Sequence, residues 1–170
     1  MKKETTKKIA LCGILSAFAC IAFMIENLFP PLFIPGAKLG LSNLFVLLAL
    51  LTLGVKYAFF SLFAKVLVSC FFAGFASAMY SLPAGTLALT AEILLIYAVK
   101  TSLPCASVAG SVINVTVQNS IFCLIAGTPE YLVYLPYLAA IAAITGFAVG
   151  TALFFTIKRL PEKNVQEDVN

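Results

Sequence analysis

Long apolar runs divide this chain, and short segments with charges, prolines or glycines separate them. Several runs exceed the length of about 18 residues that is typical of a helix spanning a membrane. The pattern predicts six spanning helices, at residues 9–29, 39–55, 57–79, 84–99, 104–126 and 131–157. The second and fourth are short for a hydrocarbon core of about 30 Å, so we expect them to run nearly upright or to dip only part of the way into the membrane.

The composition is that of a membrane protein. Hydrophobic residues make up 62% of the chain and charged residues only 11%, and the mean hydropathy is +1.05. A soluble domain of this length needs a more highly charged surface. We therefore predict an all-α integral membrane protein, with one compact six-helix domain at 1–159 and a short disordered cytoplasmic tail at 160–170.

The basic residues predict a plasma-membrane protein with both termini in the cytoplasm. In a six-span arrangement all but two of them lie on one side, and an excess of Lys and Arg is typical of the cytoplasmic side. These residues are Lys2, Lys3, Lys7, Lys8, Lys56, Lys100, Lys158, Arg159 and Lys163. Of the other two, Lys38 lies on the opposite side and Lys65 lies inside the third span. The net charge of +4 is thus explained by topology and not by nucleic-acid binding.

The sequence contains no motif of a familiar enzyme. Asp168 is the single aspartate, although prenyl diphosphate chemistry needs aspartate-rich clusters to hold magnesium and diphosphate. There is no histidine, no phosphate-binding glycine loop and no nucleophile elbow, and the five cysteines lie in apolar runs as small hydrophobic residues. We predict a chain without a catalytic site, metal or cofactor of its own, so that a partner has to supply any ATP-driven step.

Polar residues inside the spans are candidate ligand-binding residues, because an unpaired polar group in hydrocarbon is costly. Glu92 lies near the middle of the fourth span and Lys65 at a similar depth, so the two can form a buried ion pair that serves either function or helix packing alone. In the fifth span, Asn114 and Gln118 are four residues apart and share a face. Together with Asn119, they either line a ligand cavity or hydrogen bond to neighbouring helices.

A second group of polar residues lies at the outer ends of the spans and predicts a polar vestibule. Its members are Glu26, Asn27, Lys38, Asn43, Tyr80 and Glu130. Lys38 can hold a carboxylate or phosphate as a point charge, and Asn43 lies one turn inside the second helix, whose N-terminal amides also favour an anion. The alternative is that Lys38 only reaches the membrane interface and pairs with Glu26.

Small residues four positions apart mark helix faces that can pack closely. Gly13 and Ala17 form such a pair in the first span, and Ala142, Gly146 and Gly150 form a series in the last. Internal packing explains both by default. The pair in the first span can equally dock on another membrane protein.

The segment Pro35-Gly-Ala-Lys-Leu-Gly-Leu-Ser-Asn43 carries a resemblance to a known family. It follows a first span, precedes a Leu/Val-rich helix and resembles the signature of the heptaprenyl diphosphate synthase component I family, also called the Gx transporter family. This resemblance covers most of the chain. The size and the six-span plan are also similar to the S components of energy-coupling factor (ECF) transporters, as a likeness of architecture.

The two resemblances imply different functions. The S-component resemblance implies capture of a vitamin-like, flavin, quinone-related or isoprenoid-related solute from outside, with segments 30–43 and 80–85 as lids. A transmembrane coupling protein, docked on Gly13 and Ala17, and two cytoplasmic ATPases would release the solute inside. The synthase resemblance implies a noncatalytic partner of a soluble component II. We expect solute capture, because the polar residues lie at mid-membrane and on the outer side; the alternatives are the synthase subunit and a structural membrane subunit without a ligand.

Overall fold

The computed structural model describes residues 2–28 and 41–159, and all regular secondary structure in these ranges is helical. The elements are α1 (Lys2–Leu28), α2 (Leu41–Leu53), α3 (Val55–Ala73), α4 (Phe75–Ile93), the π-helical turn η1 (Leu94–Ala98), α5 (Leu103–Ala126), the 3-10 helix η2 (Pro129–Tyr134) and α6 (Leu135–Arg159). The prediction of an all-α fold is therefore confirmed.

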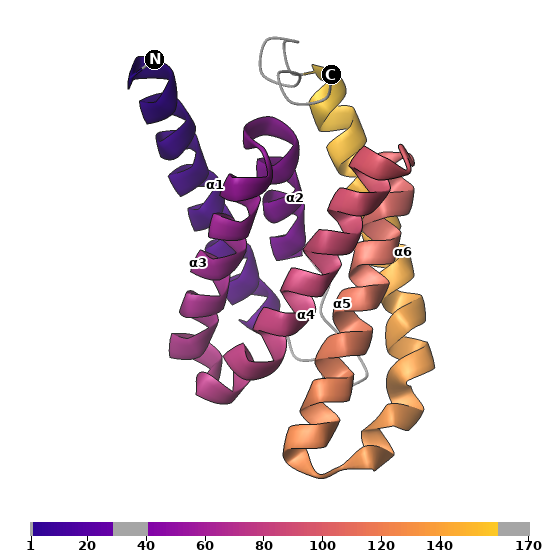
Figure 1. Ribbon diagram of the computed structural model, residues 1–170. Coiled ribbons are helices and arrows are strands. Elements are labelled where there is room, and N and C mark those ends of the chain that lie inside the picture. Colours follow the sequence, from indigo (N-terminus) through magenta and orange to yellow (C-terminus); the bar gives the residue numbers. More distant parts are fainter. Residues whose placement is uncertain (1, 29–40, 160–170) are drawn as a thin grey trace.

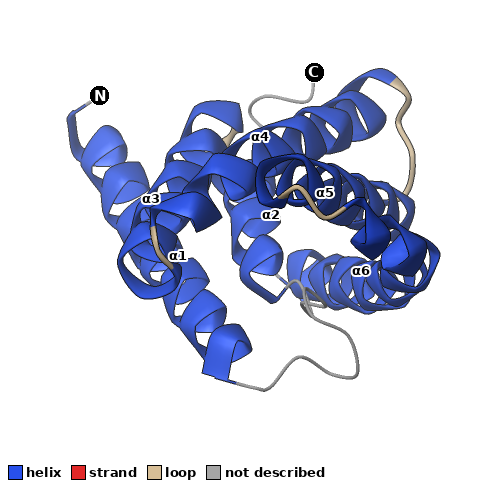
Figure 2. Cartoon of the chain, turned by 90° about the horizontal axis from the view of Figure 1, so that it is seen from below, coloured by secondary structure: helices blue, strands red, loops and turns tan. Residues whose placement is uncertain are grey.

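The helices form an up-and-down bundle in which consecutive helices run in opposite directions (Figure 1). Lys2 and Arg159 begin and end the described helices, and both lie at the same end of the bundle, which we call the terminal end. Helices α1, α2 and α3 pack on one another, α5 packs on α4 and α6, and α2 also contacts α6. Figure 2 shows the bundle from below, turned by 90° from Figure 1, and α2 lies near the middle of this view.

The described basic residues gather at the terminal end, apart from Lys65 in the middle of α3. The helix bounds place them in the first turns of α1, at the start of α3, between η1 and α5, and at the end of α6. They are Lys2, Lys3, Lys7, Lys8, Lys56, Lys100, Lys158 and Arg159. This is the one-sided arrangement that the sequence predicts.

Five helical segments of the described chain are long and apolar enough to cross a membrane, which identifies an integral membrane protein. The exception is α2, whose 13 residues span about 20 Å at 1.5 Å per residue. This is less than a hydrocarbon core of about 30 Å. Because α2 and α3 meet at Gly54 near the terminal end, the N-terminus of α2 lies within the depth of the bundle and not at its far end (Figure 1).

The predicted boundary between the third and fourth spans is wrong. Helix α3 already ends at Ala73, and α4 begins at Phe75 after Gly74, whose φ of 82° lies in a region that favours glycine. Pro83 lies inside α4, so the expected loop and lid at 80–85 is helix. The proline leaves the carbonyl four residues earlier without its helical donor, which membrane helices tolerate. The fourth span is consequently long.

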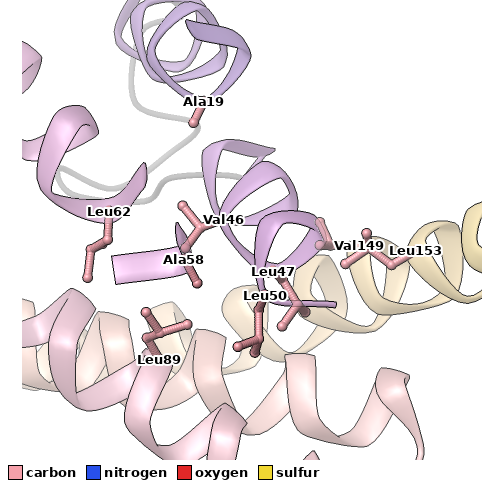
Figure 3. Close-up of a cluster of buried hydrophobic side chains, with 9 residues drawn as sticks. All are labelled: Ala19, Val46, Leu47, Leu50, Ala58, Leu62, Leu89, Val149 and Leu153. Carbon is pink, nitrogen blue, oxygen red and sulfur yellow. The ribbon is translucent and has the colours of Figure 1, made fainter. Parts of the chain in front are cut away.

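The largest buried apolar cluster surrounds α2 (Figure 3). Leu47 and Leu50 of α2 are 1% and 0% exposed. They pack with residues from α1, α3, α4 and α6, so a short helix connects both halves of the bundle. The cluster consists of Ala19, Val46, Leu47, Leu50, Ala58, Leu62, Leu89, Val149 and Leu153. Many large apolar side chains on the outside remain exposed, with Phe71 at 88%, as expected for a surface that faces lipid.

Helices α5 and α6 approach closely at glycines of α6, which confirms the predicted packing face in the last span. A Cβ at Gly150 would lie 2.6 Å from Pro104 Cα and 2.8 Å from Ser107 Cβ. A Cβ at Gly146 would lie 2.9 Å from the Ser107 carbonyl oxygen. Ala142 is 2% exposed on the same face. These contacts leave no room for even one methyl group.

We expect Gly150→Ala to lower the free energy of unfolding by about 1–3 kcal/mol, because overpacking against backbone forces α5 and α6 apart. Gly13→Ala is the matched control: Gly13 lies in α1 with no neighbouring atom within 4 Å of an added Cβ, and alanine is the better helix former. Unfolding by SDS in mixed micelles, followed by circular dichroism, measures both. Equal stability of the two variants would contradict the close packing of α5 on α6.

Candidate functional site

The polar groups inside the bundle begin at the N-terminus of α2. Glu26, near the end of α1, accepts a hydrogen bond from the backbone N–H of Leu41, and Ser42 Oγ donates to Glu26 Oε2 at 3.3 Å. Glu26 and Ser42 are 9% and 3% exposed. The first amides of a helix lack partners and carry partial positive charge, so a carboxylate stabilises them. Glu26 of the predicted vestibule therefore caps α2, with Ser42 as a partner that sequence reasoning missed.

Asn43 and Lys65 join α2 to α3. The half-buried Lys65 donates a 2.8 Å hydrogen bond from Nζ to Asn43 Oδ1. The Asn43 oxygen that was expected to face a ligand thus has an internal partner. The ammonium group thus donates to Asn43, and an ion pair between Lys65 and Glu92 stays a prediction.

Glu92 projects from α4 onto the backbone of α5. An added Cβ at Gly110 would lie 2.5 Å from Glu92 Cγ and Cδ, so only glycine at position 110 leaves room for this side chain. Glu92 is 5% exposed, and no group in 2–28 or 41–159 hydrogen bonds with its carboxyl group. Sequence reasoning gave Glu92 but missed Gly110, because the pairing of two helices cannot be read from spacing along one of them.

Glu92 does not lie at the middle of its span. It follows Phe75 by 17 residues and precedes Ala98 by 6, which places it about 8 Å from the centre of the helical run, toward the terminal end. The expectation of mid-membrane depth came from starting the span at residue 84. With α4 starting at Phe75, the centre of the span moves toward the opposite end.

The amides of α5 continue the face that begins at Gly110. At 3.6 residues per turn, Asn114 is turned about 40° and Gln118 about 80° from Gly110, whereas Asn119 is turned about 180°. All three are half-buried, and their amides have no hydrogen bond with other described residues. Asn114 and Gln118 can therefore act with Glu92, but Asn119 lies on another side of the helix.

Tyr80 belongs to an aromatic cluster away from Glu92. It is 12 residues before Glu92 on α4, or about 18 Å along the helix. Its ring packs edge-on against Phe122 of α5 at 5.8 Å, and Phe122 continues to Tyr131 of η2 at 6.1 Å. The structure thus places Tyr80 away from Glu92, beside Phe122, which follows Gln118 by about one helical turn on α5. The cluster lies at the end opposite the terminal end, where aromatic rings suit a membrane interface.

Three predicted residues remain. Lys38 and most of the 30–43 lid lie outside the described residues. Gly13 and Ala17 are exposed on α1, so they do not pack against the other described helices. Docking of this face on a partner stays a prediction.

The arrangement offers hydrogen bonding and charge inside an apolar bundle. The groups are the carboxyl group of Glu92 on α4, the ammonium group of Lys65 on α3, and the amides of Asn43 on α2 and of Asn114 and Gln118 on α5. In the described part of the chain, no three His, Cys, Asp or Glu side chains are grouped so as to hold a metal ion. The groups that are present suit the recognition of a polar molecule.

A family model described as heptaprenyl diphosphate synthase component I matches residues 15–156. The match runs from α1 into α6 and includes the helices that carry Glu26, Lys65, Glu92 and Asn114. Searches of curated proteins and of solved structures gave no significant match.

Lys65→Ala and Asn43→Ala are expected to be coupled by about 1.5–3 kcal/mol in a double-mutant cycle of unfolding free energies, because the hydrogen bond between them involves a charged donor. The control cycle combines Lys65→Ala with Gln118→Ala on α5, for which we expect no coupling. A coupling between Lys65 and Asn43 near zero would show that the hydrogen bond does not hold α2 against α3.

Gly110→Ala is expected to destabilise the protein by about 1–3 kcal/mol, because its methyl group meets the Glu92 side chain. In a Glu92→Ala background, Gly110→Ala should lower the free energy of unfolding only slightly, because the Cγ and carboxyl atoms of Glu92 that the new methyl group meets are absent. Unfolding titrations of the four proteins measure the difference. An equal loss in both backgrounds would show that Gly110 is needed for the backbone and not for Glu92.

Proposed function

We propose, because this chain belongs to the heptaprenyl diphosphate synthase component I family, that it is the noncatalytic membrane subunit of a prenyl diphosphate synthase. The observation that carries the proposal is the family match over residues 15–156. Asp168 is the only aspartate of the chain, and the described residues group no three carboxylate, thiol or imidazole side chains that could hold a metal ion. A soluble component II would therefore supply the chemistry.

The terminal end of the bundle is the surface on which such a partner is expected to dock. Lys56, Lys100, Lys158 and Arg159 are exposed at this end, and the excess of basic residues favours a cytoplasmic orientation. An acidic surface on a soluble enzyme would be attracted to them and steered into place.

A membrane subunit also suits the product of such an enzyme. A prenyl chain is a long hydrocarbon, and each methylene group that leaves water gains about 0.8 kcal/mol. Holding the synthase at the bilayer places its growing product next to an apolar phase. This chain supplies the anchor, since five of its helical segments are long and apolar enough to cross a membrane.

Co-expression with the soluble component II of the same host tests the proposal. We expect the two proteins to co-purify in mild detergent as a complex of defined stoichiometry. Lys56→Gln combined with Lys100→Gln should weaken the complex about tenfold and make it less sensitive to salt, because two of the attracting charges are removed.

Glu130→Gln serves as the matched control for this experiment. Glu130 is exposed in η2 at the opposite end of the bundle, so its neutralisation should leave the complex unchanged. If the soluble component is not retained by the unmodified chain at low salt, the synthase role is wrong.

A second candidate function, capture of a small solute, is favoured by the polar groups on α4 and α5. Glu92 is buried, Asn114 and Gln118 are half-buried, and none of the three side chains has a hydrogen bond with another described residue. Helix-packing amides would be expected to hydrogen bond to neighbouring helices. This candidate requires a small molecule that co-purifies with the chain and is lost from Asn114→Ala.

A further inference from the structure

We propose that Glu92 is the anchor of a binding site for a small organic cation, whose N–H groups donate hydrogen bonds to the Glu92 carboxylate between α4 and α5. The inference goes beyond the synthase partnership and holds with or without it. Where the chain captures a solute, the inference names the chemical class of that solute.

The first observation is a buried acceptor without a donor. Glu92 is 5% exposed, and no described residue hydrogen bonds with it. A carboxylate in this position loses its hydration, so it either gains hydrogen bonds from a donor or takes up a proton, because an unpaired buried charge is among the most costly groups in a protein. Ionisable side chains of this kind within spanning helices mark binding sites and ion pathways.

The second observation is the balance of charge. Among the described charged residues that lie between the packed helices, the buried Glu26 and Glu92 are acidic and the half-buried Lys65 is basic. Glu26 is engaged with the N-terminus of α2, and the ammonium group of Lys65 donates to Asn43. When Glu92 is ionised, the two carboxylates and the one ammonium carry one net negative charge, which a bound cation would neutralise and a bound anion would increase.

The third observation is the shape and chemistry of the facing helix. Gly110 presents bare backbone to the Glu92 carboxyl group. Asn114 and Gln118 follow along α5, turned about 40° and 80° from Gly110, and each amide offers both a donor and an acceptor. A ligand bound at Glu92 can therefore extend along α5 and use the amides for its uncharged polar groups.

These features select an organic cation over a metal ion. Calcium takes six to eight oxygen ligands and magnesium six in an octahedron, whereas the described part of the chain groups no three carboxylate, thiol or imidazole side chains together. An ammonium or amidinium group needs only acceptors at hydrogen-bond distance, and one carboxylate supplies two oxygens for this purpose.

Native mass spectrometry of the full chain, purified in mild detergent from its own host, tests the proposal. Acid extraction then releases any bound compound for identification. We expect a cationic nitrogen compound at one copy per chain. Glu92→Gln should lower its occupancy about tenfold to a hundredfold, because glutamine has the same size but no charge. Glu130→Gln, at the exposed η2, should retain it.

Dicyclohexylcarbodiimide distinguishes a bound cation from a bound proton, because this apolar reagent modifies protonated carboxyl groups in membranes. A cation at Glu92 should protect the side chain from modification. A neutral or anionic compound, or a cation retained fully by Glu92→Gln, would overturn the proposal. An empty protein would also overturn it, and modification of Glu92 in that protein would identify a proton as the occupant.

Folding of each variant is checked by size-exclusion chromatography and circular dichroism. Should Glu92→Gln fail to fold, Asn114→Ala retains the carboxylate and takes its place. A partial loss of the cation from Asn114→Ala supports the site on α5, and unchanged occupancy overturns it. Neither result depends on a soluble synthase component, so this site and the synthase partnership fail independently.

Discussion

The N-terminus of α2 lies within the depth of an apolar bundle, and the rest of the structure depends on how its amides are satisfied. Lipid and packed apolar side chains offer these groups no hydrogen bonds. The Glu26 carboxylate from α1 and the Ser42 hydroxyl group lie at the start of α2, and the Lys65 ammonium group from α3 reaches Asn43 one turn on. Three helices are thus fixed to one another by polar contacts at a single level.

This polar contact positions the apolar core. With its first turn held, α2 presents Leu47 and Leu50 to helices of both halves of the bundle, where they are almost completely buried. The same contact engages two of the three charged groups in the described interior. Glu92 is the third, and Gly110 gives it space without giving it a donor. A binding site and a rigid core therefore arise from the same small set of buried charges.

Sequence reasoning succeeded where the signal lies within one helix and failed where it lies between two. The spacing of Gly146 and Gly150 is a local pattern, and these residues do pack on α5. Pro83 and the neighbouring glycine suggested a loop, but Gly74 makes the turn, because a proline inside a membrane helix can be accommodated whereas a turn requires a special φ. Because α4 therefore starts at Phe75 and not at residue 84, Glu92 lies off the centre of its span. Tyr80 lies within α4 and packs in an aromatic cluster with Phe122.

The sequence by itself determined the class of protein, the number of apolar segments and the side on which the basic residues lie, because hydropathy and charge act along the chain and need no knowledge of neighbours. It also marked Glu92, Asn114 and Gln118 as costly in hydrocarbon. Only the tertiary structure decided their partners. Whether a buried charge is satisfied depends on distances of a few ångströms between helices, so the assignment of Lys65 to Asn43, of Glu26 to α2 and of Glu92 to the bare backbone of Gly110 required the packed bundle.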